Sequence, residues 1–290
     1  MSRRYDCSDP RQRADGLADA AACVRRGELV VMPTDTVYGI GANAFLPEAV
    51  QALLDAKGRD RQMPAPVLVG SVRAASALID DLGTFGQDLL DEFWPGPLTV
   101  VCRANPSLSW DLGETKGTVA VRMPLHDLAL ELLRDTGPMA VSSANLTGGA
   151  PARTAAEAEE AFGDAIAVYL DGGVSGDLPP STIVDLTGTV PRLLRAGAIP
   201  EKKLKDVLGV LVVDGEDEAE GEAEGGAEHA EHAESAESVE KPEEAQSAAK
   251  AEDAAGVQEP AEAKEPAETE ESPQAPAAEQ AGGQKDAHAE

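Results

Sequence analysis

The chain has few cysteines and few histidines, and each shortage excludes a class of protein. Its three cysteines, Cys7, Cys23 and Cys102, are an odd number without the CxxC spacing of zinc sites. A disulfide framework is therefore not expected, and free thiols fit a reducing compartment such as the cytoplasm. His126 is the only histidine before residue 214, which argues against a histidine-based metal site or a Ser-His-Asp triad.

Long apolar runs are also missing. No run approaches the roughly 20 residues that a membrane-spanning helix needs, so we expect no membrane segment. The N-terminal segment MSRRYDCSDPRQR has no apolar stretch after its basic residues, and a signal peptide is not expected.

The net charge of −29 is distributed unevenly. Residues 214–290 contain 25 of the 53 acidic residues and four Lys, which gives this segment a charge of −21 and leaves −8 for the rest. The segment has no aromatic residue and hardly any Val, Leu or Ile, so it cannot bury enough apolar surface to offset chain entropy. We predict a disordered Ala/Glu/Pro-rich acidic tail over 214–290, with a solubilising or partner-tuning role or none. One ordinary domain over 14–200 precedes it, with 201–213 as a linker or last element.

Apolar periodicity within the predicted domain alternates between helical and strand spacing. Strands and helices interleave with some short connections, which predicts a single α/β domain with a mixed sheet flanked by helices. Ser71 and Thr154 are expected N-caps, and Glu157 completes a capping box with Thr154. The expected helices span 14–26, 47–57, 71–79, 87–93, 127–134 and 154–162. The expected strands span 28–32, 66–69, 98–102, 118–122, 139–142, 167–170, 182–186 and 193–195, and 208–213 is a last strand or an apolar hinge.

Two segments of small polar residues follow apolar strands, where the ligands of open α/β sheets collect. Residues 33–43, PTDTVYGIGAN, place two threonine hydroxyls and a phenol on a glycine-containing turn. Residues 141–149, VSSANLTGG, follow another strand. Such residues supply short hydrogen-bonding groups and let a ligand approach the backbone, although each segment also fits a capped turn that binds nothing.

Two common nucleotide motifs do not account for these segments. Gly39, Gly41 and Ala44 match the spacing of the dinucleotide fingerprint, but six residues separate the strand from Gly39 and no helix is predicted at Gly41. The chain also lacks the GxxxxGK[ST] pattern, which excludes a P-loop ATPase.

Basic residues stand at the ends of predicted elements. Lys57 and Arg59 flank Gly58, which frees the backbone so that both cations can turn toward one place, and Arg122 and Arg195 end apolar strands. Cations at the ends of buried strands are costly unless an anion meets them. A carboxylate of the protein is one such partner. Convergence of all four cations on one cleft would instead describe a polyphosphate site.

Two other residues invite a structural interpretation. His126 precedes a predicted helix, and a structural role there is favoured over substrate contact. Trp94 is expected in the core, followed by a rigid Pro-Gly-Pro turn that shapes the wall of a cleft.

Seven segments then occur in order at ordinary spacing: PTDTVYGIGANA, KGR, FWPGPLT, VAVRMP, SSANLTG, STIVDL and LLRAG. Together they resemble the YrdC-like family, the L-threonylcarbamoyladenylate synthases, over residues 14–200. The resemblance implies a twisted α/β sheet with a deep basic cleft, in a cytoplasmic, ATP-binding nucleotidyltransferase. The implied reaction converts L-threonine, bicarbonate and ATP into L-threonylcarbamoyl-AMP and pyrophosphate. A separate tRNA threonylcarbamoyltransferase complex then modifies the tRNA adenosine next to the anticodon, and double-stranded RNA binding is among the implied properties.

The resemblance also implies roles for individual residues. Its Lys-x-Arg and Ser-x-Asn signatures match Lys57, Arg59, Ser143 and Asn145, which are the expected catalytic residues. The expected ATP contacts are Arg59, Thr118, Ser143 and Arg195, and the expected threonine contacts are Thr36, Arg122, Val141 and Ser181. No metal ligand is implied, and Mg²⁺ is expected to arrive with ATP.

The sequence departs from the usual family pattern in three places. Met63-Pro64 stands where Asn-Pro is usual, Leu68 stands at an often polar position, and the acidic tail stands where longer members carry a second domain. The alternative function is an RNA-binding module of the same fold without synthase activity, although the acidic charge opposes broad affinity for RNA. A carbamoyl-transfer enzyme acting on another acceptor is a third interpretation.

Overall fold

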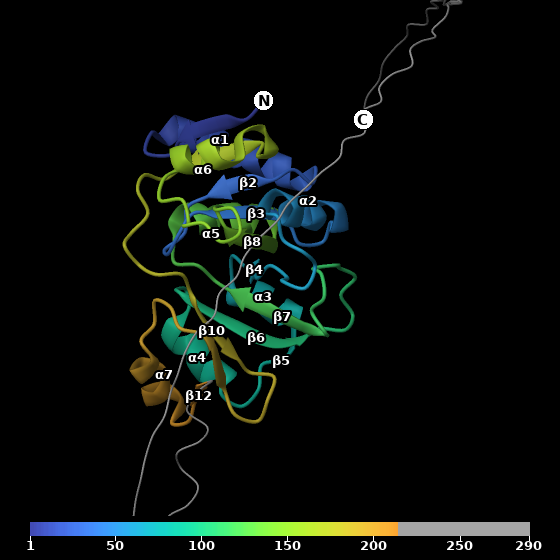
Figure 1. Ribbon diagram of the computed structural model, residues 1–290, viewed down its shortest axis with the longest axis vertical. Coiled ribbons are helices and arrows are strands. Elements are labelled where there is room, and N and C mark those ends of the chain that lie inside the picture. The colour runs from blue at the N-terminus through green and yellow to red at the C-terminus, as the bar shows by residue number, and fades with distance from the viewer. Residues whose placement is uncertain (214–290) are drawn as a thin grey trace, which may run out of the picture. The chain divides into compact units, whose positions relative to one another are not determined.

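The computed structural model describes residues 1–213, and the predicted acidic tail lies outside the described residues. Within this part of the chain, twelve strands form one mixed sheet in the order β1-β9-β2-β3-β8-β4-β7-β6-β10-β11-β12, with β5 paired to β6 (Figure 1). The strands are β1 (Arg3–Asp6), β2 (Val30–Met32), β3 (Gly39–Asn43), β4 (Val67–Leu68), β5 (Ile79–Asp81), β6 (Leu98–Ala104), β7 (Thr118–Arg122), β8 (Met139–Ser143), β9 (Val168–Asp171), β10 (Thr182–Asp185), β11 (Arg192–Arg195) and β12 (Val212–Val213).

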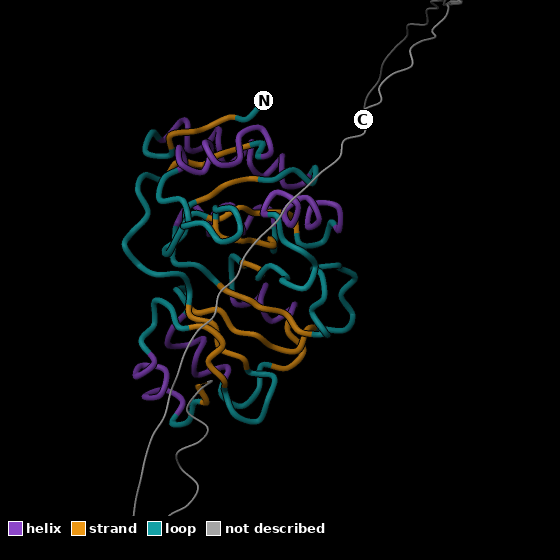
Figure 2. The backbone as a smooth tube through the Cα atoms, in the orientation of Figure 1, coloured by secondary structure: helices purple, strands orange, loops and turns teal. Residues whose placement is uncertain are grey.

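Helices flank the sheet, as Figure 2 shows in purple. They are α1 (Pro10–Arg25), α2 (Pro47–Lys57), α3 (Val72–Leu78), α4 (Gly86–Phe93), α5 (Asp127–Thr136), α6 (Ala155–Phe162) and α7 (Glu201–Leu208). The predicted mixed α/β architecture is therefore confirmed. Both parallel pairs, such as β4 with β7, and antiparallel pairs, such as β3 with β8, occur in the sheet.

The core lies on both faces of the sheet, because side chains alternate between faces along each strand. Val31 packs with the larger apolar cluster, which includes residues of α2, α3, α4, α6 and α7. Its neighbours Val30 and Met32 pack with the second cluster, which is formed with α1 and α5. The same alternation occurs in β8, where Ala140 belongs to the first cluster and Met139 to the second.

Local hydrogen bonds explain where several helices begin. The carboxylate of Asp9 accepts from the N–H groups of Arg11 and Gln12 at 2.9 Å, so α1 begins at Pro10, four residues earlier than predicted. Ser71 caps α3 as predicted. Thr154 caps α6 by accepting from the N–H of Glu157 at 3.1 Å.

Some expectations need correction. The carboxylate of Glu157 accepts from the N–H of Arg153 at 2.7 Å rather than from that of Thr154, so the predicted capping box is only half formed. The turn expected over 33–43 ends early, because Gly39–Asn43 is strand β3, paired on both sides. Within 201–213 the chain forms α7 and β12, which the apolar pattern at 208–213 indicated only in part.

Candidate active site

A small cavity of about 130 Å³ gathers residues that are far apart in the sequence. It lies where the β2–β3 loop and the turn after α2 meet residues of β4, β6, β7, β8 and β11 and the segment just before β10. The lining residues are Thr34, Thr36, Val37, Tyr38, Gly39, Arg59, Pro66, Leu68, Thr99, Arg122, Val141, Ser142, Ser143, Pro180, Ser181 and Arg195. Three arginines and several hydroxyls therefore surround one space, which suits an anionic ligand.

Arg122, at the end of β7, is the most deeply buried of the three arginines. Its Nη2 forms an ion pair with Asp35 at 2.6 Å. Its Nη1 donates to the Thr36 hydroxyl at 3.0 Å, and its Nε donates to the carbonyl oxygen of Gly96 at 3.0 Å. Burial lowers the pKa of Arg122, and the charge of Asp35 acts in the opposite direction. The Trp94-Pro-Gly-Pro turn therefore contacts Arg122 through Gly96, but none of its residues is among the described residues that line the cavity, so its expected role in shaping the cleft wall stays a prediction.

Arg195, at the end of β11, has only neutral partners among the described residues. Its Nε and Nη2 donate to the carbonyl oxygen of Ser181 at 3.0 and 2.7 Å, and Nη2 also donates to the Ser181 hydroxyl at 3.0 Å. That hydroxyl bonds to the hydroxyl of Thr99 at 2.9 Å. Burial and the nearby Arg59 lower the pKa of Arg195. Its positive charge is held in place but is not neutralised.

The side chain of Arg59 has no hydrogen bond or ion pair within residues 1–213. Its Nε is buried without a partner, although its side chain lines the cavity. A buried donor without a partner costs free energy that a bound ligand can recover. Arg59 is therefore a cation available to a ligand.

Lys57 occupies a different place from the one that the sequence suggested. Gly58 ends α2 in a left-handed conformation, with φ 61°. Arg59 lines the cavity after this bend, but Lys57 is buried at 1% exposure and is not among the lining residues. Its ammonium donates to the backbone carbonyls of Ser143 and Asn145 and to the Asn145 side-chain oxygen at 3.3 Å. Burial and the charge of Arg59 lower the pKa of Lys57 to about 8.

The structure brings most of the predicted site residues together. The cavity is lined by Thr36, Arg59, Arg122, Val141, Ser143, Ser181 and Arg195. Asn145 does not line it, but its side-chain oxygen accepts from the Ser143 hydroxyl at 2.5 Å and so lies directly behind the wall. Thr118 stands at the opposite end of β7 from Arg122, where its hydroxyl donates to the carbonyl of Thr115 at 2.8 Å. Its expected contact with ATP stays a prediction.

Sequence reasoning gave no role to Asp35 or Thr99. Thr99 is buried at 1% exposure and bonds to Ser181. A threonine in the otherwise apolar start of β6 was the signal for it, because a buried hydroxyl requires a partner. Asp35 lies within the first polar segment, in the loop between β2 and β3. Its pairing with Arg122 at the end of β7 depends on the tertiary fold, because the two residues are far apart in the sequence.

Neither His126 nor Trp94 is among the described residues that line the cavity. His126 precedes α5 and does not line the cavity, and burial lowers its pKa. Trp94 is buried in the larger cluster, and its Nε1 donates to the carbonyl of Leu98 at 2.8 Å. Both positions agree with the structural roles predicted for these side chains.

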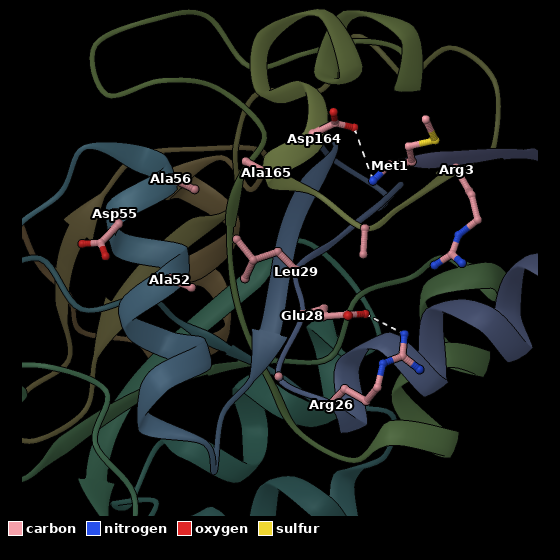
Figure 3. Close-up of a pocket in the computed structure, with 12 residues that line it drawn as sticks. Met1, Arg3, Arg26, Glu28, Leu29, Ala52, Asp55, Ala56, Asp164 and Ala165 are labelled. Carbon is pink, nitrogen blue, oxygen red and sulfur yellow. Dashed lines mark hydrogen bonds and ion pairs between the residues drawn. The ribbon is translucent and has the colours of Figure 1, made fainter. Parts of the chain in front are cut away.

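A larger cavity of about 690 Å³ lies elsewhere, beside the N-terminus and α2. Figure 3 shows Arg26 paired with Glu28 and the N-terminal amine of Met1 paired with Asp164. These pairs measure 2.6 and 3.8 Å. Arg26 and the N-terminal amine are thus each paired with a carboxylate of the same cavity, and no predicted site residue is among its described lining residues.

No described helix is both long and apolar enough to cross a bilayer. No group of three or more His, Cys, Asp or Glu side chains is placed to hold a metal ion in the described part of the chain.

The fold and the cavity define a mixed α/β protein with a cavity lined by three arginines. The Sua5/YciO/YrdC family model, which is described as telomere recombination, matches residues 22–197. A protein of Mycobacterium tuberculosis, with a provisional assignment as a threonylcarbamoyl-AMP synthase, is 52% identical over 210 residues, covering 72% of this chain and 97% of that protein. The chain therefore belongs to the Sua5/YciO/YrdC family.

Two more distant relatives are longer than the matched region. The threonylcarbamoyl-AMP synthase of Bacillus subtilis is 38% identical over 200 residues, covering 68% of this chain and 58% of that protein. The crystal structure of Pyrococcus abyssi Sua5 complexed with L-threonine superposes with a TM-score of 0.66 and 34% identity, covering 73% of this chain and 62% of that one. The chain thus spans less than two thirds of the length of each of these two relatives.

Proposed function

We propose that this protein is an L-threonylcarbamoyladenylate synthase, a nucleotidyltransferase that converts L-threonine, bicarbonate and ATP into L-threonylcarbamoyl-AMP and pyrophosphate. The observation that carries the proposal is the convergence of Arg59, Arg122 and Arg195 on one cavity. Among the described residues, only Arg122 of these three has a carboxylate partner. The names of the M. tuberculosis and B. subtilis relatives and the threonine complex of the P. abyssi protein support the same reaction.

The cavity has one set of side chains that suits L-threonine and another set that suits ATP. Arg122, Thr36, Val141 and Ser181 combine a partly neutralised guanidinium, hydroxyls and a valine side chain, which suit the carboxylate, hydroxyl and methyl group of threonine. Arg59, Arg195 and Ser143 offer uncompensated positive charge and a hydroxyl, which suit the phosphates of ATP.

The reaction needs orientation and charge stabilisation more than covalent catalysis. Bicarbonate takes up a proton and loses water to give carbon dioxide, and the threonine amine attacks its carbon and releases a proton to form the carbamate. The carbamate is unstable in water, so holding it in the cavity, away from bulk solvent, protects it. The carbamate oxygen then attacks the α-phosphorus, and pyrophosphate leaves. Negative charge that builds on the phosphate oxygens is stabilised by the guanidinium groups of Arg59 and Arg195. Lys57 acts indirectly, because its ammonium holds the turn that carries Ser143 and Asn145.

The donors of the cavity do not fit a protein-held Mg²⁺. No carboxylate is among the described side chains that line it, and Mg²⁺ prefers carboxylate and phosphate oxygens. Mg²⁺ would therefore be carried by the phosphate oxygens of ATP rather than by side chains of the cavity.

The product is a mixed anhydride of a carbamate and a phosphate, so a further enzyme must consume it. In this proposal a tRNA threonylcarbamoyltransferase complex in the cytoplasm transfers the threonylcarbamoyl group to the adenosine beside the anticodon. The RNA-binding alternative rests on the same arginines, because they would also attract the phosphates of double-stranded RNA or tRNA.

One assay distinguishes these functions. The full chain is incubated with ATP, L-threonine and bicarbonate, and pyrophosphate release and the nucleotide product are followed by coupled assay and mass spectrometry. We expect release that requires both threonine and bicarbonate. Release that ignores threonine contradicts the proposal, and release with another amine acceptor indicates the carbamoyl-transfer interpretation. Salt-sensitive tRNA binding without any turnover indicates the RNA-binding module.

A further inference from the structure

Asp35 and Arg122 form a buried ion pair behind the cavity. Their side chains are only 10% and 7% exposed, and Nη2 of Arg122 lies 2.6 Å from Oδ1 of Asp35. Buried ion pairs lose hydration that their attraction only partly restores, so they are weak contributors to stability. A functional explanation is therefore needed for this pair.

The guanidinium group of Arg122 is held by three hydrogen bonds to two segments of the chain, the β2–β3 loop and the turn before β6. Gly96 accepts from Nε, Thr36 accepts from Nη1 and Asp35 accepts from Nη2. Within residues 1–213 these bonds use three of the five N–H donors that an arginine carries. Two donors are left for a ligand in the cavity that Arg122 lines.

Asp35 is held by only one of its two oxygens. Oδ1 accepts from Arg122 and from the N–H of Leu125 at 3.0 Å. Oδ2 is buried and has no hydrogen-bond partner in the described part of the chain. The carbonyl oxygen of an asparagine could accept the same two bonds. The carboxylate therefore adds a negative charge beside Arg122, and this charge is not needed for the hydrogen bonds.

The negative charge of Asp35 makes the two ends of the cavity electrostatically different. Arg122 is neutralised by Asp35, whereas Arg195 bonds to the neutral groups of Ser181, and Arg59 has no described partner. A doubly charged phosphate gains little from a neutral pair, but a zwitterionic amino acid can still bond through its carboxylate to the fixed N–H groups.

We propose that Asp35 is a positioning and specificity-determining residue that fixes the Arg122 guanidinium and cancels its net charge. The Arg122 end of the cavity then accepts the single carboxylate of an α-amino acid, and phosphate groups are directed to Arg59 and Arg195. This inference rests on the proposed synthase function.

The test compares Asp35→Asn with wild type and with Asp135→Asn, which removes the charge from an exposed Asp–Arg pair between α5 and α1. L-Threonine is titrated by calorimetry, KM values for threonine and ATP are measured, and inorganic tripolyphosphate is used as a competitor. In Asp35→Asn the two hydrogen bonds are kept and only the negative charge is lost, so we expect threonine affinity to change by less than about threefold. We expect the KM for ATP to stay within about twofold, and we expect tripolyphosphate to become a competitor of threonine. In wild type and Asp135→Asn, tripolyphosphate should compete with ATP alone.

Every other outcome either supports or overturns the proposed role of Asp35. Asp35→Asn in which tripolyphosphate still competes with ATP alone overturns the inference and leaves the synthase function standing. Equal losses for threonine and ATP indicate a merely structural role and also overturn it. Asp35→Glu restores the charge if Asp35→Asn folds poorly, and it should keep tripolyphosphate away from the threonine site. Failure of that rescue counts against the inference. A wild-type protein that neither binds nor requires threonine overturns both proposals.

Discussion

The ammonium group of Lys57 donates to both carbonyl oxygens of Asn145, the backbone oxygen and the side-chain oxygen. The connection is reciprocal, because the hydroxyl of Thr147 donates to the backbone carbonyl of Lys57 at 2.7 Å. The end of α2 and the turn after β8 are therefore fastened together. The Lys-x-Arg and Ser-x-Asn signatures are two halves of one structural unit, and Arg59 and Ser143 are the members that line the cavity.

Replacing Lys57 by Met should reduce both stability and turnover. The substitution keeps the apolar stem but leaves the backbone oxygen of Asn145 without its donor, and a buried polar group without a partner costs about 1–3 kcal/mol. Turnover should fall at least about tenfold, because the turn carrying Ser143 loses its anchor. Urea unfolding and the pyrophosphate assay measure the two effects. Lys202→Met, at an exposed lysine of α7, is the control and should change neither. Unchanged stability in Lys57→Met would show that the ammonium does not hold the turn.

Replacing Arg59 by Ala should reduce turnover without reducing stability. The side chain of Arg59 has no hydrogen bond or ion pair within the described residues, and its charge lowers the pKa values of Lys57 and Arg195. Its loss removes a phosphate contact and relieves repulsion, so we expect turnover at least about tenfold lower and a free energy of unfolding that is equal or higher. Arg61→Ala is the matched control, because Arg61 pairs with Asp111 at the surface. Wild-type turnover in Arg59→Ala would count against the assigned nucleotide site.

The depressed pKa of Lys57 predicts a specific dependence of stability on pH. Burial lowers this pKa from 10.5 to about 8, so between these values the unfolded chain binds a proton that the folded protein does not. The contribution of Lys57 to the free energy of unfolding therefore rises with pH across this window. Below about pH 8 both states are protonated and the burial penalty is complete. Urea unfolding at several pH values should show this rise in wild type relative to Lys57→Met. Parallel pH profiles for the two proteins would refute the assignment.

Removing residues 214–290 should leave the reaction intact. The whole cavity lies within the described residues, and the alignment that covers 97% of the M. tuberculosis relative needs only 210 residues of this chain. A protein ending at Val213 should show threonine-dependent pyrophosphate release within about twofold of the full chain. A much larger loss would mean that the acidic segment takes part in catalysis or in holding the cavity together.

Local patterns predicted the architecture well and its irregular parts poorly. The bounds of α2 and β7 agree with prediction because Pro47 and Gly58 mark the two ends of the helix and TVAVR has strong strand propensity. Strand β3 was missed because Gly39 and Gly41 suggest a turn. Their lack of side chains instead admits Val141 and Met139 of β8, and a Cβ atom at Gly41 would lie 2.5 Å from Cε of Met139. Such a contact between strands cannot be read from local spacing.

The sequence by itself determined the α/β class, the capping residues and the set of cations that end buried elements, because these follow from apolar periodicity and from the hydrogen-bonding needs of chain ends. Only the tertiary structure decided how those cations divide their work. The ammonium of Lys57 is buried and donates to the turn after β8. Arg59 and Arg195 line the cavity without a carboxylate partner among the described residues, and Arg122 is paired with Asp35. The physical reason is that neutralisation of a cation depends on its distance from a carboxylate. Strand pairing sets this distance between residues that are far apart in the sequence, and no local pattern encodes it.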